Sequence, residues 1–178
     1  MNSSARDSWQ QPKAVIQSLN ISPGALVADL GAGGGSFTFG LAEAVGPEGR
    51  VYAVDIDRDD LEYIARYARE KRIANVEVVQ AVEDDPRLLE QSTDLIFTCN
   101  TAHHLSDRAA YFRSAARYLR PHGRVAIIDY TPTGFAWLFG HATAKEVIRQ
   151  EMETAGYRLI EEFDYLSKQH FQVFRLRE

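Results

Sequence analysis

The chain has 178 residues, of which 45% are hydrophobic and 25% are charged. These values are typical of one globular domain that is large enough to bury its own core. The formal net charge at pH 7 is −5, so the overall field repels phosphate backbones and we expect no nucleic-acid partner. The single cysteine, Cys99, excludes an internal disulfide. Its apolar surroundings in the sequence predict a buried thiol.

No stretch of the chain approaches the roughly 20 apolar residues that a membrane-spanning helix needs. Residues 1–12 are polar and do not contain the apolar core of a signal peptide. We therefore expect a cytoplasmic protein without integral membrane association, present as a monomer or a homodimer.

Short runs of β-forming residues alternate with segments that have helical periodicity. The predicted strands cover residues 25–30, 50–55, 76–80, 94–98, 124–130, 157–165 and 170–176. Apolar residues at helical spacing predict helices over residues 36–45, 61–68, 112–119 and 144–155. Gly156 is expected to end the last of these helices.

Alternating strands and helices predict an α/β fold with a mostly parallel, doubly wound sheet of seven strands. The last two predicted strands have only a hairpin-length connection between them, so one antiparallel strand is expected near the C-terminal edge. Residues 1–20 are interpreted as an N-terminal helical segment and residues 21–178 as the single domain. Ligands of such sheets bind where strands end, at their carboxyl edge.

A glycine-rich turn follows the first predicted strand, at Gly31, Ala32, Gly33 and the two glycines after them. Glycines allow a tight bend and a close approach of the backbone to a ligand. An acid, Asp55, ends the second strand at the distance expected for a nucleotide-binding unit. Its carboxylate can accept hydrogen bonds from both hydroxyls of a ribose.

The acid just before this turn, Asp29, argues against a dinucleotide, because its charge would repel a pyrophosphate. The turn also does not contain the third glycine of the dinucleotide fingerprint. S-adenosylmethionine carries an ammonium, a sulfonium and a ribose diol but no phosphate, so Asp29 and Asp55 match its charges. An NAD-linked oxidoreductase is the alternative.

Five motifs then occur in the order found in class I S-adenosylmethionine-dependent methyltransferases. The chain resembles that family, and its ubiquinone/menaquinone-type small-molecule branch in particular, at residues 27–35, 51–57, 80–86, 94–105 and 119–124. The resemblance extends over residues 12–174 and implies a Rossmann-like sheet with S-adenosylmethionine as the cofactor, released as S-adenosylhomocysteine.

The resemblance also implies a role for each matching residue. The methionine part of the cofactor is expected at Asp29, Gly31, Ala32, Gly33 and Gly35, the ribose at Asp55, the adenine at Ile56, Val82 and Glu83, and the sulfonium above Asn100. The chain departs from the family at Ala81-Val82, where Gly-Asp is frequent, so polar contacts with adenine fall to Glu83, Asp84 or the backbone. It also has His122 where glycine is usual.

Candidate bases for the methyl acceptor follow the fourth and fifth strands or lie in the next loop. They are His103, His104, Asp129, Tyr130 and His141. The aromatic segment 135–140 is interpreted as a wall of the acceptor pocket. The histidines and Asp129 have no established metal-ligand spacing, so no metal is expected.

These observations predict an enzyme that transfers a methyl group from S-adenosylmethionine to a small molecule by in-line displacement. Alignment of donor and acceptor is its main task, and a base is needed only for a protonated acceptor. Because no cap domain is inserted in the sequence, a protein methyltransferase is one alternative. A cofactor-binding partner protein without catalytic activity is another.

Overall fold

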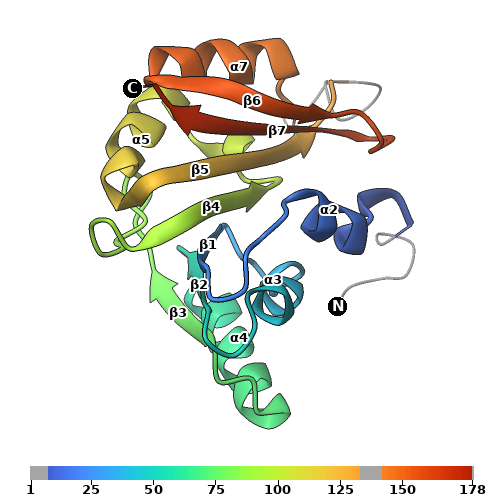
Figure 1. Ribbon diagram of the computed structural model, residues 1–178, viewed down its shortest axis with the longest axis vertical. Helices are drawn as coiled ribbons and strands as arrows, with labels where there is room; N and C mark the ends of the chain where they lie inside the picture. Colours follow the sequence, from blue (N-terminus) through green and yellow to red (C-terminus); the bar gives the residue numbers. More distant parts are fainter. Residues whose placement is uncertain (1–7, 133–141, 178) are drawn as a thin grey trace.

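The computed structural model describes residues 8–132 and 142–177, which form seven strands and the helices around them (Figure 1). The strands are β1 (Leu26–Leu30), β2 (Arg50–Asp55), β3 (Val76–Gln80), β4 (Thr93–Cys99), β5 (Leu119–Tyr130), β6 (Tyr157–Phe163) and β7 (Gln169–Leu176). They form one sheet in the order β3-β2-β1-β4-β5-β7-β6. Strand β7 is antiparallel to both of its neighbours, and the remaining pairs are parallel.

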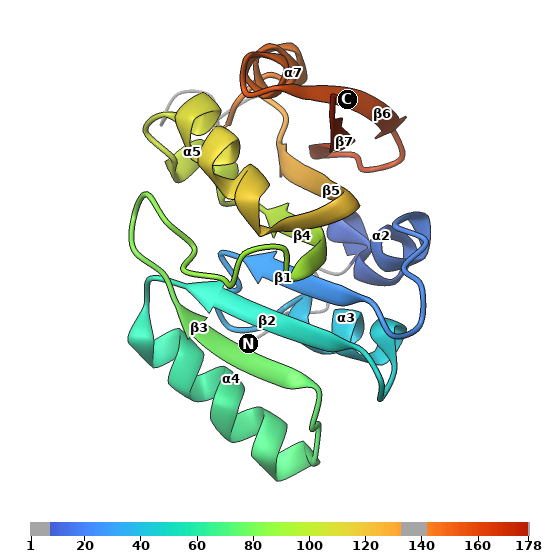
Figure 2. The same cartoon turned by 60° about the vertical axis from the view of Figure 1, so that its left-hand side comes forward.

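Helices cover both faces of the sheet, as Figure 2 shows. One face carries α2 (Pro12–Ser18), α3 (Thr38–Val45) and α4 (Arg58–Lys71), and the other carries α5 (Arg108–Ala115) and α7 (Lys145–Thr154). The predicted doubly wound α/β sheet with one reversed strand is therefore confirmed.

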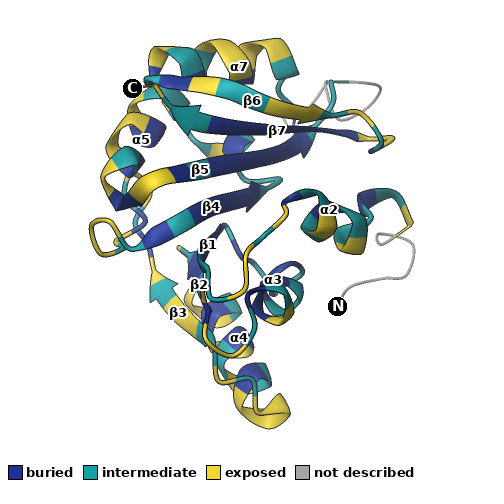
Figure 3. Cartoon of the chain, in the orientation of Figure 1, coloured by how far each residue is buried: buried dark blue, intermediate teal, exposed yellow. Residues whose placement is uncertain are grey.

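Burial explains why the central strands are almost continuously apolar. Figure 3 shows that β4, β5 and β7 are largely buried, whereas β3 at the sheet edge is more exposed. Strands covered on both faces must be apolar on both faces. The N-terminal segment joins the same core, because Val15 and Leu19 are fully buried beside α3 residues.

The largest boundary difference concerns β5, which begins at Leu119 rather than at residue 124. Thr93 pairs with Leu119 and Leu95 pairs with Arg124, so the segment between them is an irregularity in the ladder. His122 there has a φ of 67°. Proline and glycine in that segment indicated a turn, but the chain bulges without leaving the sheet. The predicted helix over residues 112–119 correspondingly ends earlier, in the 3-10 turn η2 (Ala116–Tyr118).

Within the described ranges, no helix is both long enough and apolar enough to cross a membrane.

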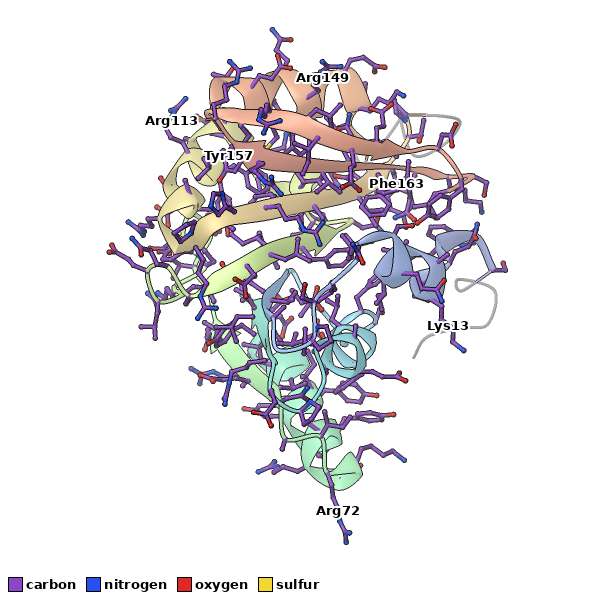
Figure 4. All side chains as sticks on the ribbon, in the orientation of Figure 1. Lys13, Arg72, Arg113, Arg149, Tyr157 and Phe163 are labelled. Carbon is purple, nitrogen blue, oxygen red and sulfur yellow. The ribbon has the colours of Figure 1, made fainter. Side chains whose placement is uncertain are left out.

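A buried hydrogen bond joins helix α5 to the C-terminal strands and gives a test of this packing. Tyr157, labelled in Figure 4, lies at the start of β6, and its hydroxyl donates to the Phe112 carbonyl of α5 at 2.9 Å. Tyr157→Phe should lower the free energy of unfolding by about 1 kcal/mol, since one buried hydrogen bond is lost without a change of shape. Urea denaturation measures the difference. The control, Tyr63→Phe on the exposed side of α4, should leave stability unchanged, and equal effects would contradict this account.

Candidate functional site

The glycine turn lies at the carboxyl ends of β1 and β2, where it is held against its neighbours. The Gly31 and Ala32 amides both donate to the Val54 carbonyl of β2, at 2.8 and 3.1 Å. Gly31 has a φ of 72°, and a Cβ at this position would lie 2.1 Å from Oγ1 of Thr101. Glycine is therefore required here both by the left-handed backbone and by the close approach of the chain after β4.

Asp55 connects this turn to the end of β2. One carboxylate oxygen accepts a hydrogen bond from the Gly33 amide at 2.7 Å, and the other accepts from the Asp57 amide at 2.9 Å. Asp57 in turn caps the first turn of α4. Each carboxylate oxygen has a second lone pair, so Asp55 can hold the turn and still accept from ligand hydroxyls.

Asp29 is 3% exposed and accepts a hydrogen bond from the Thr38 hydroxyl of α3 at 2.6 Å. Burial raises the pKa of this carboxyl from 3.8 to about 7, the Thr38 hydrogen bond opposes that shift, and the charge of Asp55 adds to it. A cation placed next to Asp29 would favour its ionised form.

Two adjoining cavities open at the carboxyl ends of β1, β2 and β4. The smaller one, of about 170 Å³, includes Asp29, the glycine turn and Gln10, and we call it the Asp29 cavity. The larger one, of about 570 Å³, includes Asp55, Ile56, Val82 and Glu83, and we call it the Asp55 cavity. Both are lined by Gly31, Asn100 and Thr101, so a single elongated ligand can occupy the two together.

Asn100 stands where the two cavities meet and has an unusual conformation. Its φ is 57°, in the left-handed region, and its amide donates to the Ile128 carbonyl at 2.8 Å. Its side-chain Oδ1 accepts from Gln169 at 2.7 Å, while its buried Nδ2 has no hydrogen-bond partner among the described residues. A buried donor without a partner is costly, so this atom is suited to meet a ligand.

The lining of both cavities fits a nucleoside that carries positive charge and no phosphate. Neither cavity is lined by a lysine or arginine in the part of the chain that the structure describes. The side chain of Ile56 is 58% exposed at the edge of the Asp55 cavity, where an aromatic base can cover it. The residues present thus fit S-adenosylmethionine, because Asp29 is suited to its ammonium and Asp55 to its diol.

Two of the candidate bases, His103 and Asp129, form a buried pair. The His103 ring Nδ1 lies 2.7 Å from one Asp129 oxygen, and the His103 backbone amide donates to the other at 2.9 Å. The two side chains are 5% and 0% exposed. His104 lines the Asp55 cavity, and its ring centroid lies 4.1 Å from that of His103.

Aromatic residues border this pair. The ring of Tyr130 lies 6.3 Å from that of His103 and 5.9 Å from that of Trp9, which belongs to the N-terminal segment. His141 and the aromatic segment 135–140 fall outside the described residues. Within those residues, no group of three or more acidic, histidine or cysteine side chains is placed to hold a metal ion.

Comparison with known proteins identifies the class that this fold and site define. Residues 21–170 match the family described as "Methyltransferase domain", so the chain belongs to that family. The predicted resemblance to the family of S-adenosylmethionine-dependent methyltransferases is confirmed.

Three relatives illustrate the range of similarity. The chain is 33% identical to nocamycin O-methyltransferase of Saccharothrix syringae, covering 62% of this chain and 39% of that protein. It is 30% identical to the ubiquinone/menaquinone biosynthesis C-methyltransferase of Shewanella woodyi, covering 65% of this chain and 47% of that protein. It thus spans less than half of these two relatives. The crystal structure of a SAM-dependent methyltransferase from Aquifex aeolicus superimposes with a TM-score of 0.90 and 23% identity, over 98% of this chain and 94% of that one.

Several residues at the cavities were not expected from the sequence. Thr38 meets Asp29, Thr101 packs on Gly31, and Gln10 lines the Asp29 cavity from the N-terminal segment, where its Nε2 donates to the Cys99 sulfur at 3.2 Å. Thr38 follows the glycine turn closely enough to have been a candidate. Gln10 carries no sequence signal, since its position depends on how α2 packs.

The packing of the turn against Thr101 leads to a stability test. Gly31→Ala should lower the free energy of unfolding by about 2 kcal/mol, because it adds both a clash and a strained φ. Gly34→Ala is the matched control: a Cβ added at this position would have no atom within 4 Å, and a change below about 1 kcal/mol is expected. Chemical denaturation of both variants compares them, and equal losses would contradict the geometry.

The raised pKa of Asp29 predicts how cofactor binding depends on pH. If the ionised carboxylate meets the cofactor ammonium, the affinity for S-adenosylhomocysteine should rise about tenfold from pH 6 to pH 8, as Asp29 loses its proton. Isothermal titration calorimetry measures this dependence. Asp29→Asn should bind more weakly and show little change over the same range.

Without ligand, the stability of the protein should fall with rising pH, whereas the affinity for the cofactor rises. Because the folded state holds the proton more tightly than the unfolded chain, the contribution of Asp29 to stability falls as the pH rises from about 4 to about 7. Asn cannot ionise, so Asp29→Asn should raise Tm at pH 8 more than at pH 5. A pH-independent affinity in the unsubstituted protein would show that Asp29 does not face the ammonium.

Proposed function

We propose that this protein transfers a methyl group from S-adenosylmethionine to a small-molecule acceptor that carries a removable proton. The observation that carries the proposal is the buried pair of His103 and Asp129, which adjoins the Asp55 cavity through His104: the His104 ring packs on that of His103 and lines the cavity. The relatives named above support a small acceptor, since their names describe a nocamycin and a quinone methyltransferase.

In this proposal the chain holds the cofactor through residues at the ends of β1, β2 and β4. Asp29 receives the ammonium, Asp55 the ribose diol, and Ile56, Val82 and Glu83 border the adenine. Asn100 lies beneath the sulfonium, and its Nδ2 can donate to an acceptor atom of the cofactor. When bound, S-adenosylmethionine supplies a methyl group on a cationic sulfur, which is already activated for displacement. The remaining task is alignment of the acceptor.

His103 is the proposed base. The Asp129 carboxylate favours the ring form that carries its proton on Nδ1, which makes Nε2 the basic nitrogen. Asp129 also accepts from the His103 and Tyr130 amides, so it fixes the ring and its backbone together. A proton removed from an acceptor hydroxyl, amine or acidic carbon would reside on Nε2, and the imidazolium would be stabilised by the buried carboxylate. His104 is proposed as a neighbouring contact for the acceptor.

A labelled-methyl transfer screen tests the function. The purified protein is incubated with methyl-labelled S-adenosylmethionine and a fractionated cell extract, and the label should appear in the small-molecule fraction. Label in protein would instead favour the alternative of a protein methyltransferase. Bound cofactor without any transfer would favour a non-catalytic partner protein.

Substitution of the pair separates chemistry from binding. His103→Ala should lower kcat by about a hundredfold or more, the usual contribution of a base, with cofactor affinity nearly unchanged. Asp129→Asn should lower kcat, because the amide no longer holds the His103 ring in the form that carries its proton on Nδ1. His122→Ala, at the opposite end of the sheet, is the control and should keep full activity. Unchanged turnover in His103→Ala would remove the base from the mechanism.

A further inference from the structure

A further cavity lies at the opposite edge of the sheet from the Asp29 and Asp55 cavities, near the amino ends of β1, β4 and β5. Its volume is about 490 Å³, and it is bordered by residues 20–25, by the irregular segment 121–123 and by Arg124 and Arg175. It shares no residue with either cavity of the proposed methyl-transfer site.

The strand register places like charges opposite one another here. Arg124 of β5 is paired with Arg175 of β7, and Arg175 is paired with Arg158 of β6. Side chains of directly opposed residues in antiparallel strands share a face, so these three arginine side chains lie on one face of the sheet. Like charges in such positions repel one another and are ordinarily destabilising.

The two arginines that line the cavity differ in their partners. Arg124 donates to the Leu19 and Asn20 carbonyls at the end of α2, which gives it a structural role. Arg175 has a buried Nε without a hydrogen-bond partner among the described residues. A guanidinium carries five donors in a planar fork that matches an oxyanion, so Arg175, which lines the cavity with its Nε donor unused, can serve an anion there.

Nearby acids only partly offset this charge. Asp94 lines the cavity, but one of its oxygens already accepts from the Leu26 amide at 2.8 Å and from Arg120 at 3.4 Å. Burial lowers the pKa of Arg124, while the charge of Glu161 raises it and that of Arg175 lowers it further. Ser22 and His122 add polar side chains to the lining.

We propose that this cavity binds the phosphate group of a small phosphorylated molecule, with the Arg175 guanidinium as its main ligand and Arg124 and Ser22 beside it. Such an anion would pair with the Arg175 guanidinium where it lines the cavity and would relieve the repulsion among the three arginines. A concave cavity and a net charge of −5 favour a small molecule over a nucleic acid. This site is independent of the proposed methyl transfer.

The test uses pyrophosphate as the probe and the full chain at constant ionic strength. In an amide NMR titration, saturable shifts should map to residues 20–25, 121–124 and 175. Saturating S-adenosylhomocysteine should leave these shifts in place, since the two sites are separate. Shifts confined to the glycine turn, or no saturable binding, would overturn the proposal whether or not methyl transfer is observed.

Variants identify the ligand residue. Arg175→Gln should weaken pyrophosphate binding at least about tenfold, as expected for the loss of a charged hydrogen-bond partner. Arg69→Gln on α4 removes the same charge far from the cavity and should bind normally. Equal affinity in the two variants would overturn the proposal.

Thermal unfolding gives a second measurement that does not depend on the NMR assignment. Pyrophosphate should raise Tm of the unsubstituted protein and of Arg69→Gln but not of Arg175→Gln, because only a ligand of the folded state stabilises it. Without the anion, Arg175→Gln should be at least as stable as the unsubstituted chain, since repulsion is removed. A short DNA duplex is the competing ligand, and displacement of pyrophosphate by the duplex at a lower concentration would overturn the small-molecule assignment.

Discussion

A carboxylate buried beside the glycine turn is the constraint on which this site depends. Removing Asp29 from water disfavours its charge, and a single hydroxyl from Thr38 compensates for only part of that cost. An amide side chain at this position could accept the Thr38 hydrogen bond without the cost of a buried charge. This loss of stability has a physical explanation if the carboxylate binds a cationic ligand, since functional sites commonly retain groups that reduce stability.

The sheet order explains why the site forms where it does. Strands β1 and β4 are neighbours, and from β1 the chain runs outward to β2 and β3 before it returns to β4 and β5. The connections on the two sides of this point therefore diverge and leave a crevice at the carboxyl ends. The glycine turn enters the crevice from one side, and Asn100 with Thr101 enters from the other. Close contact between Gly31 and Thr101 fixes the distance between them.

Local signals in the sequence were enough to predict this architecture. Periodicity identified all seven strands, and β2 and β3 match their predicted bounds because hydrophobic runs and turn residues coincide there. The predicted start of β5 was wrong. Proline and glycine flank His122, and these residue types occur in bulges as well as in turns. Only the pairing with β4 shows that the segment is a bulge. Asp29 and Asp55 were predicted as ligand-binding residues from motif spacing, because they lie at the ends of β1 and β2.

Contacts between distant segments could not be predicted in the same way. The pairing of His103 with Asp129 joins residues that are 26 positions apart, and each was proposed alone, not as a unit. Gln10 reaches the Asp29 cavity through the packing of α2, and Gln169 reaches Asn100 from β7. Such contacts depend on helix placement and strand register, which a single sequence does not encode in any short pattern.

The two edges of the sheet differ in charge, and this difference has a physical consequence. Acids at the carboxyl edge suit a cationic nucleoside, whereas guanidinium groups at the amino edge suit an anion. Among the described residues, neither lysine nor arginine lines the Asp29 cavity or the Asp55 cavity. A phosphate there would meet the charges of Asp29 and Asp55 without a cation to offset the repulsion. The same phosphate at the amino edge would meet Arg175. Electrostatics alone can therefore keep the two kinds of ligand at opposite edges of one sheet, without any barrier between the cavities.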